Sequence, residues 1–121
     1  MNLRILVVDD EKINRVTRTR QLNESGCVAE AHETPFTALT ALDRGAWDVV
    51  ITDLRMPTMD GITFHQALRA KPEFALTPFI FLTGVNNLKE VKAVCKPECD
   101  MLLQKPFPVD QLLRIFTGKF K

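Results

Sequence analysis

Five residues that could bind a cation and perform nucleophilic chemistry stand at or just after the ends of apolar runs. They are Asp9, Asp10, Asp53, Thr83 and Lys105. Carboxylates that lie close together repel one another unless a cation neutralises them. Mg²⁺ prefers oxygen ligands of this kind, and a lysine beside them can balance charge or hold an anionic oxygen. The pattern indicates a cation pocket beside a nucleophile.

The same residue types also fit structural roles when each is taken alone. An Asp-Asp pair such as Asp9-Asp10 is typical of a turn that caps a helix. Thr83-Gly84 is typical of an ordinary strand end, although a residue without a side chain also lets a ligand approach the backbone. The chemical interpretation therefore depends on elements that bring all five residues to one place.

Short apolar runs provide those elements. Runs bounded by polar residues are typical of buried strands, and we predict strands at Leu3–Val8, Cys27–Ala31, Asp48–Thr52, Phe79–Leu82 and Met101–Gln104. The segments between them are long enough for helices. Strands that alternate with helices favour an α/β fold with a parallel sheet covered on both faces. In such sheets ligands bind beyond the carboxyl ends of the strands.

The first predicted helix runs from about Lys12 to Glu24 and ends at Ser25-Gly26. We expect its buried stripe to consist of Ile13, Val16 and Leu22. Its polar face carries three arginines, Arg15, Arg18 and Arg20. These are either ordinary solvated charges or part of a surface for a partner.

Four further helices follow from spacing and capping residues. The second begins with Thr34 as N-cap before Pro35 and stops at Gly45. The third starts after Asp60-Gly61. The predicted buried face is Phe36, Leu39 and Leu42 in the second helix, and Ile62, Phe64 and Leu68 in the third. In the fourth helix it is Val85, Leu88, Val91 and Val94 or Cys95, and Pro97 ends that helix. In the fifth it is Val109, Leu112, Leu113 and Phe116.

Length and composition indicate one ordinary globular domain over residues 1–121. The chain is 45% hydrophobic and 26% charged, and its net charge is +1. That balance provides no global field to attract nucleic acid or anionic lipid. No apolar run is long enough for a signal peptide or a membrane span, so we expect a cytoplasmic protein, either a monomer or a weak dimer.

The cysteines argue against both disulfides and zinc. Cys27, Cys95 and Cys99 are odd in number and contain no CxxC pair. A disulfide framework is therefore not expected. His32 and His65 lie far from the Cys95 and Cys99 pair in sequence, so a zinc site is not expected either.

The chain resembles the receiver domains of two-component response regulators, the CheY-like family. The resemblance is carried by Asp9-Asp10, Asp53, Met56-Pro57 with Asp60-Gly61, Thr83-Gly84 and Lys105-Pro106-Phe107, in that order. It extends from about Ile5 to Phe116. It implies a flavodoxin-like three-layer sandwich in which a five-stranded parallel sheet of order 2-1-3-4-5 is packed with five helices.

The resemblance also implies a role for each site residue. Asp53 would accept a phosphoryl group from a histidine kinase or a histidine phosphotransfer domain. Asp10 would bind Mg²⁺ directly, Asp9 mainly through water, and the main-chain carbonyl of Arg55 would add a ligand. Thr83 and Lys105 would each contact a phosphoryl oxygen, and the Lys105-Pro106 bond would be cis. The domain would signal through changed protein contacts and turn over no external substrate.

The chain departs from the family pattern at Leu102, where receivers usually have Tyr or Phe. An aromatic switch coupled to Thr83 is therefore not expected in its usual form. Arg55 and Val85 flank the expected phosphoryl group, and we hypothesise that they obstruct water and lengthen the phosphorylated state. The Asp10 to Arg15 segment is similar to receivers attached to hybrid histidine kinases, so the chain is either a stand-alone regulator or a module.

Three other functions compete with this interpretation. A phosphohydrolase of the haloacid-dehalogenase type needs a second Asp two residues after its nucleophile, and Arg55 stands there. A flavodoxin needs a phosphate-binding loop after its first strand, where Asp9, Asp10 and Glu11 would repel phosphate. A scaffold that binds a partner without phosphorylation would not need the acidic residues.

Overall fold

The computed structural model describes residues 3–54, 61–83, 88–104, 110–112 and 114. Five parallel strands form one sheet in the order β2-β1-β3-β4-β5. Their bounds are Arg4–Val8 for β1, Val28–His32 for β2, Val49–Asp53 for β3, Phe79–Thr83 for β4 and Asp100–Gln104 for β5. Each prediction was right to within one residue, and the predicted strand order is confirmed.

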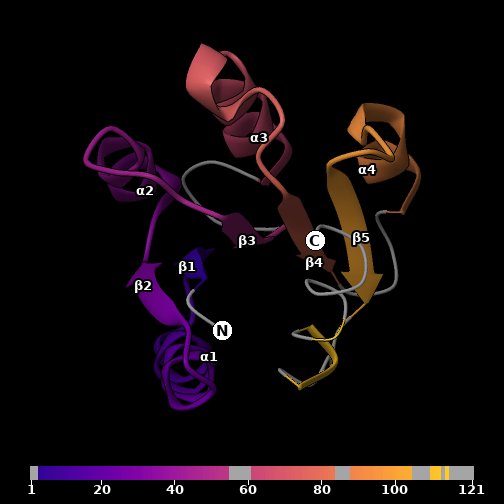
Figure 1. Ribbon diagram of the computed structural model, residues 1–121. Coiled ribbons are helices and arrows are strands. Elements are labelled where there is room, and N and C mark those ends of the chain that lie inside the picture. The colour runs from indigo at the N-terminus through magenta and orange to yellow at the C-terminus, as the bar shows by residue number, and fades with distance from the viewer. Residues whose placement is uncertain (1–2, 55–60, 84–87, 105–109, 113, 115–121) are drawn as a thin grey trace.

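Helices cover both faces of the sheet (Figure 1). They are α1 (Lys12–Glu24), α2 (Pro35–Leu42), α3 (Gly61–Arg69) and α4 (Leu88–Val94), with a short 3₁₀ helix, η1, at Pro72–Phe74 that the sequence did not predict. Residues 110–112 and 114 are helical, and the rest of the last predicted helix lies outside the described residues. The architecture is the flavodoxin-like α/β sandwich.

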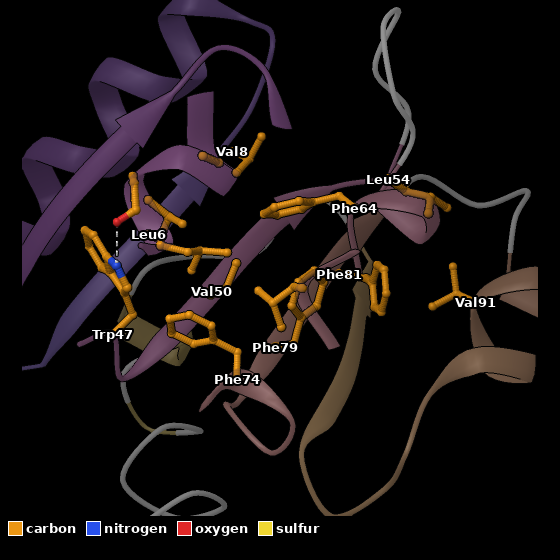
Figure 2. Packing of buried hydrophobic residues seen from close by; sticks show 14 residues of the cluster. Leu6, Val8, Trp47, Val50, Leu54, Phe64, Phe74, Phe79, Phe81 and Val91 are labelled. Atoms are coloured by element: carbon orange, nitrogen blue, oxygen red, sulfur yellow. Dashed lines mark hydrogen bonds between the residues drawn. The ribbon is translucent and has the colours of Figure 1, made fainter. Parts of the chain in front are cut away.

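Two buried clusters hold the layers together because successive strand residues point to opposite faces. One cluster packs β1, β3 and β4 against α2, α3 and α4, and Figure 2 shows its Phe64, Phe79 and Phe81 side by side. The indole N–H of Trp47 donates to the Ala41 carbonyl at 3.2 Å. The other cluster joins Leu22 of α1 and Leu112 to the opposite face.

The capping residues of the first two helices behave as predicted. Gly26 follows α1 with φ of 92°, a left-handed conformation that favours glycine. The Thr34 hydroxyl accepts a hydrogen bond from Thr37 N–H at 3.4 Å, and Pro35 occupies the first turn of α2. These signals mark the end of α1 and the start of α2, but α2 ends at Leu42 with Asp43 as its C-cap, three residues before the predicted stop at Gly45.

The buried stripe predicted for α1 is wrong in part. Leu22 is fully buried, whereas Ile13 is 78% exposed and Val16 is 55% exposed. At 100° per residue, Leu22 lies half a turn around the helix from Ile13. Arg15 and Arg18 share the face of Leu22 instead. The contacts of these arginines with Asp9 hold that face toward the sheet.

The buried face predicted for α2 also needs correction. Phe36 is 54% exposed, and the buried residues are Pro35, Ala38, Ala41 and Leu42. Leu39 is only partly buried against the core. Ala38 and Ala41 face the core, and Phe36, which lies about half a turn around the helix from Ala38, faces solvent.

A buried polar network ties α3 to the start of β5. The side chain of Asp100 is fully buried and accepts hydrogen bonds from Nε2 of His65 at 3.0 Å, from Nη2 of Arg69 and from Lys96 N–H at 2.8 Å. Arg69 also donates to the Phe74 carbonyl at 2.7 Å. Burial alone would raise the pKa of the Asp100 carboxyl, but the hydrogen bonds from His65, Lys96 and Arg69 outweigh it and lower that pKa.

The sequence predicted neither disulfides nor a membrane span. Cys27, Cys95 and Cys99 are all free thiols in the structure. Within the described part of the chain, no helix is long and apolar enough to cross a membrane.

Candidate functional site

Strand register brings two of the predicted acids to one level of the sheet. Val8 of β1 pairs with Thr52 of β3, so the next residues, Asp9 and Asp53, stand side by side at the carboxyl edge. The Asp9 N–H donates to the His32 carbonyl at 3.1 Å and continues the pairing of β1 with β2. The edge position of these acids is therefore set by backbone pairing.

Asp9, Asp10 and Asp53 form a compact carboxylate cluster. One oxygen from each lies within 4.8 Å of the others. Asp9 is fully buried, Asp53 is 7% exposed and Asp10 is half-buried. Three hard oxygen donors at this spacing fit Mg²⁺, which takes one or two carboxylates and keeps several waters. The structure thus brings together the three carboxylates that the sequence predicted as metal ligands.

The two acids at the end of β1 differ in their contacts. Oδ1 of Asp9 accepts a hydrogen bond from Glu11 N–H at 2.9 Å, and Oδ2 accepts one from Nη1 of Arg18 at 3.0 Å. Among the described residues, no hydrogen bond or ion pair engages the carboxylate of Asp10. Asp10 therefore has its oxygens available for a cation, whereas both oxygens of Asp9 are already in use.

Thr83 ends β4 close to Asp53 in the sheet. Asp53 pairs with Leu82, and Leu54 N–H donates to the Leu82 carbonyl at 3.0 Å. Thr83 is the next residue and is 2% exposed. The hydroxyl predicted as a phosphoryl contact therefore stands at the same edge as the carboxylates.

Gly61 packs directly against the backbone at the end of β3. A Cβ added there would lie 2.9 Å from the Asp53 carbonyl oxygen and 3.1 Å from Cα of Leu54. The Gly61 N–H also donates to the Leu54 carbonyl at 2.7 Å. The start of α3 thus fixes the segment that carries Asp53.

Replacing Gly61 with alanine is expected to destabilise the protein by about 1–3 kcal/mol because backbone must move to admit the methyl group. The matched control is Gly45→Ala, whose Cβ would meet only the flexible guanidinium of Arg4, at 3.1 Å. Urea unfolding of both variants measures the difference. Equal stabilities for the two variants would contradict this packing role of Gly61.

Several predicted site features lie outside the described residues. They are Lys105 and its proposed cis bond to Pro106, the carbonyl of Arg55, Met56-Pro57, Asp60, Gly84 and Val85. Their roles stay predictions. Leu102 is described: it is partly buried in β5, where it pairs with Phe81 and packs against the cluster that contains Phe79.

Sequence comparison identifies the family. Residues 5–117 match the model of the response regulator receiver domain, and the chain belongs to that family. It is 35% identical over 112 residues to the sensor histidine kinase RcsC of Salmonella typhi, and 32% identical over 113 residues to the response regulator MprA of a Mycobacterium species. The matches cover 92% and 93% of this chain but 12% and 48% of those proteins.

Solved structures agree with this assignment. The chemotaxis protein CheY4 of Vibrio cholerae, 29% identical, superposes with a TM-score of 0.87 over 98% of this chain and 99% of its own. The receiver domain of the sensor histidine kinase PA1611 from Pseudomonas aeruginosa, 26% identical, superposes with a TM-score of 0.82 over 98% of both chains, and its structure holds a magnesium ion in the active site cleft. The family is a signalling domain of two-component systems.

Proposed function

We propose that this domain accepts a phosphoryl group on Asp53 in a Mg²⁺-dependent reaction and relays the signal through altered protein contacts. The observation that carries the proposal is the cluster of Asp9, Asp10 and Asp53 at the carboxyl edge of the sheet. A carboxylate can serve as a covalent nucleophile. Phosphoryl transfer depends mainly on positioning and charge neutralisation, which a cluster beside a bound cation supplies.

The reaction forms one bond and breaks another. An oxygen of the Asp53 carboxylate attacks phosphorus, the P–N bond of a phosphohistidine breaks, and the imidazole leaves with the electron pair. Mg²⁺, when bound, neutralises charge on the phosphoryl oxygens. Asp10 and Asp53 would hold it directly with the Arg55 carbonyl, and Asp9 would contribute through water. Thr83 would donate to one phosphoryl oxygen and Lys105 would pair with another.

The donor in this proposal is a histidine kinase or a histidine phosphotransfer domain that docks on α1. Ile13 and Val16 expose apolar surface on the face of α1 that also carries Arg20. Next to Val16, a groove of about 620 Å³ lies between α1 and β2, lined by Arg15, Val16, Thr19, Arg20, Asn23 and Ala31 among others. Exposed apolar side chains rimmed by polar ones are typical of protein interaction sites. The domain would act either as a stand-alone regulator or as a module of a longer protein.

The competing functions explain the site less well. A phosphohydrolase would need an acid two residues after Asp53, where the chain has Arg55. A phosphorylation-independent scaffold would gain nothing from gathering three mutually repelling carboxylates. We therefore propose no turnover of external substrates beyond the domain's own phosphorylation and dephosphorylation.

Intact mass spectrometry after incubation with acetyl phosphate and Mg²⁺ tests the proposal. The parent chain is expected to gain one phosphoryl group, and Asp53→Asn is expected to gain none, since an amide is not a nucleophile here. A gain retained by Asp53→Asn would overturn the assignment of Asp53. Continuous release of phosphate from many phosphate esters would favour the hydrolase, and no gain by either protein would favour the scaffold.

A further inference from the structure

Arg18 of α1 lies within the acidic site although it belongs to none of the motifs that define it. Its Nη1 lies 3.0 Å from Oδ2 of Asp9, and the two side chains are 15% and 0% exposed. On the same helix face, Nη1 of Arg15 donates to the main-chain carbonyl of Asp9 at 3.0 Å. Two arginines thus hold Asp9, and Arg18 is the one that pairs with its carboxylate.

This ion pair changes what Asp9 can offer a metal. Its Oδ1 is engaged by Glu11 N–H and its Oδ2 by Arg18. A cation that binds Asp9 directly must either share an oxygen with one of these donors or displace it. A cation that binds only to Asp10 or Asp53 is still repelled by the Arg18 guanidinium, which is paired with the neighbouring Asp9 carboxylate. In either case the guanidinium opposes the cation.

The charge of the cluster makes this opposition large. Three carboxylates carry three negative charges, and Arg18 neutralises one of them. A guanidinium stays protonated at every pH at which proteins fold. Because the pair is largely buried, salt screens it less than a surface pair.

We propose that Arg18 is a built-in counter-cation of the acidic site, which holds Asp9 while the metal is absent and weakens the binding of Mg²⁺. The proposal rests on the proposed function, because it takes the carboxylate cluster to be a Mg²⁺ site. It assigns Arg18 as a positioning residue that sets how much Mg²⁺ the domain requires.

Mg²⁺ titration of the unphosphorylated domain tests the proposal, with backbone amide NMR shifts of the cluster as the readout. Arg18→Gln is expected to bind Mg²⁺ about tenfold more tightly, since a neighbouring unit charge acting on a divalent ion is worth about that much even in a high dielectric. Arg18→Lys keeps the charge and is expected to stay near the parent. Arg20→Gln is the control, because Arg20 is exposed and forms its ion pair with Glu24, at 4.0 Å, away from the carboxylate cluster.

Thermal unfolding with Mg²⁺ or with EDTA adds a second measurement, the difference in melting temperature between Arg18→Gln and the parent. If the role of Arg18 were purely structural, Mg²⁺ would not change that difference. Without metal, Arg18→Gln is expected to melt below the parent because Asp9 then lies buried beside two like charges. Saturating Mg²⁺ is expected to close most of that gap. A purely structural Arg18 would lower the melting temperature equally in both conditions, and that result would overturn the proposal.

The remaining outcomes separate this proposal from the proposed function. Equal or weaker Mg²⁺ binding by Arg18→Gln, with clear binding by the parent, would overturn the role of Arg18 alone. Absence of binding by both proteins would overturn the metal role of the cluster and this proposal with it. If Arg18→Gln does not fold, Arg18→Met, which retains more of the apolar stem, serves as the neutral variant.

Discussion

Asp10→Asn is expected to weaken Mg²⁺ binding about thirtyfold or more. Asp10 is half-buried in the cluster, and no described residue engages its carboxylate, so it has the most direct access to a cation. Losing one negative charge in contact with a divalent ion costs about 2 kcal/mol even at the dielectric constant of water. Asparagine keeps the size and an oxygen ligand. The measurement is the Mg²⁺ dissociation constant from the same NMR titration.

Asp43→Asn is the charge-matched control for this prediction. Asp43 caps the end of α2, its side chain is 62% exposed, and it pairs with Lys71 at 2.9 Å. Its removal changes the net charge of the chain by the same amount but leaves the carboxylate cluster intact. Equal losses of affinity in the two variants would show that net charge alone attracts the ion, and would contradict a direct role for Asp10.

Asp100→Ala is expected to lose about 3–5 kcal/mol of unfolding free energy, the cost of leaving the largely buried Arg69 guanidinium without its carboxylate partner. The change removes an acceptor that is fully buried and bonded to His65, Arg69 and the backbone of Lys96. Since a domain of this size is stable by only about 5–15 kcal/mol, the loss is a large fraction of the total. Urea unfolding at neutral pH measures it, and a loss below that of an exposed pair, about 1 kcal/mol, would contradict the network.

The pH dependence of stability gives the same network a second test. Because the folded protein has a lowered Asp100 pKa, the unfolded chain binds a proton here more readily. The stabilisation is therefore complete above the ordinary carboxyl pKa, about 4, and is lost as pH falls through the lowered value. The parent is expected to lose more stability than Asp100→Asn between pH 5 and pH 3. Parallel pH profiles would contradict this assignment.

The sheet and its acidic edge could be predicted because they depend on local pattern. Apolar runs bounded by polar residues placed every strand to within a residue. Because the strands run parallel, the carboxyl ends of neighbouring strands then meet at one edge of the sheet. Asp53 and Thr83 close their strands, so their place at the carboxyl edge followed from the strand assignments, whereas the strand order that makes β1, β3 and β4 neighbours came from the resemblance to receiver domains.

The polar contacts made by helices could not be predicted in the same way. Ile13 and Val16 were assigned to the buried stripe by residue type, but Leu22 alone of that set faces the sheet. Counting 100° per residue around α1 would have placed Arg15 and Arg18 on the face of Leu22. His65 and Asp100 are 35 residues apart in sequence, and no local signal links them.

We expect Leu102 to affect how the domain relays the phosphorylation that we propose. Leu102 lies in β5, is partly buried and pairs with Phe81 of β4. The family usually has an aromatic ring at the position of Leu102. Rotation of a ring at this position therefore has no part in the relay that we propose. The end of β3 at Asp53 and Leu54 is instead coupled to α3 through the close packing of Gly61 on the Asp53 carbonyl and on Cα of Leu54.

The most direct measurement of the central claim locates the phosphoryl group chemically. Borohydride reduces an acyl phosphate to an alcohol, so a phosphorylated Asp53 becomes homoserine, which peptide mass spectrometry identifies by position. We predict homoserine at position 53 alone, in samples given both acetyl phosphate and Mg²⁺, and none in samples given EDTA. Homoserine at position 9 or 10 instead, or none under any condition, would contradict the account.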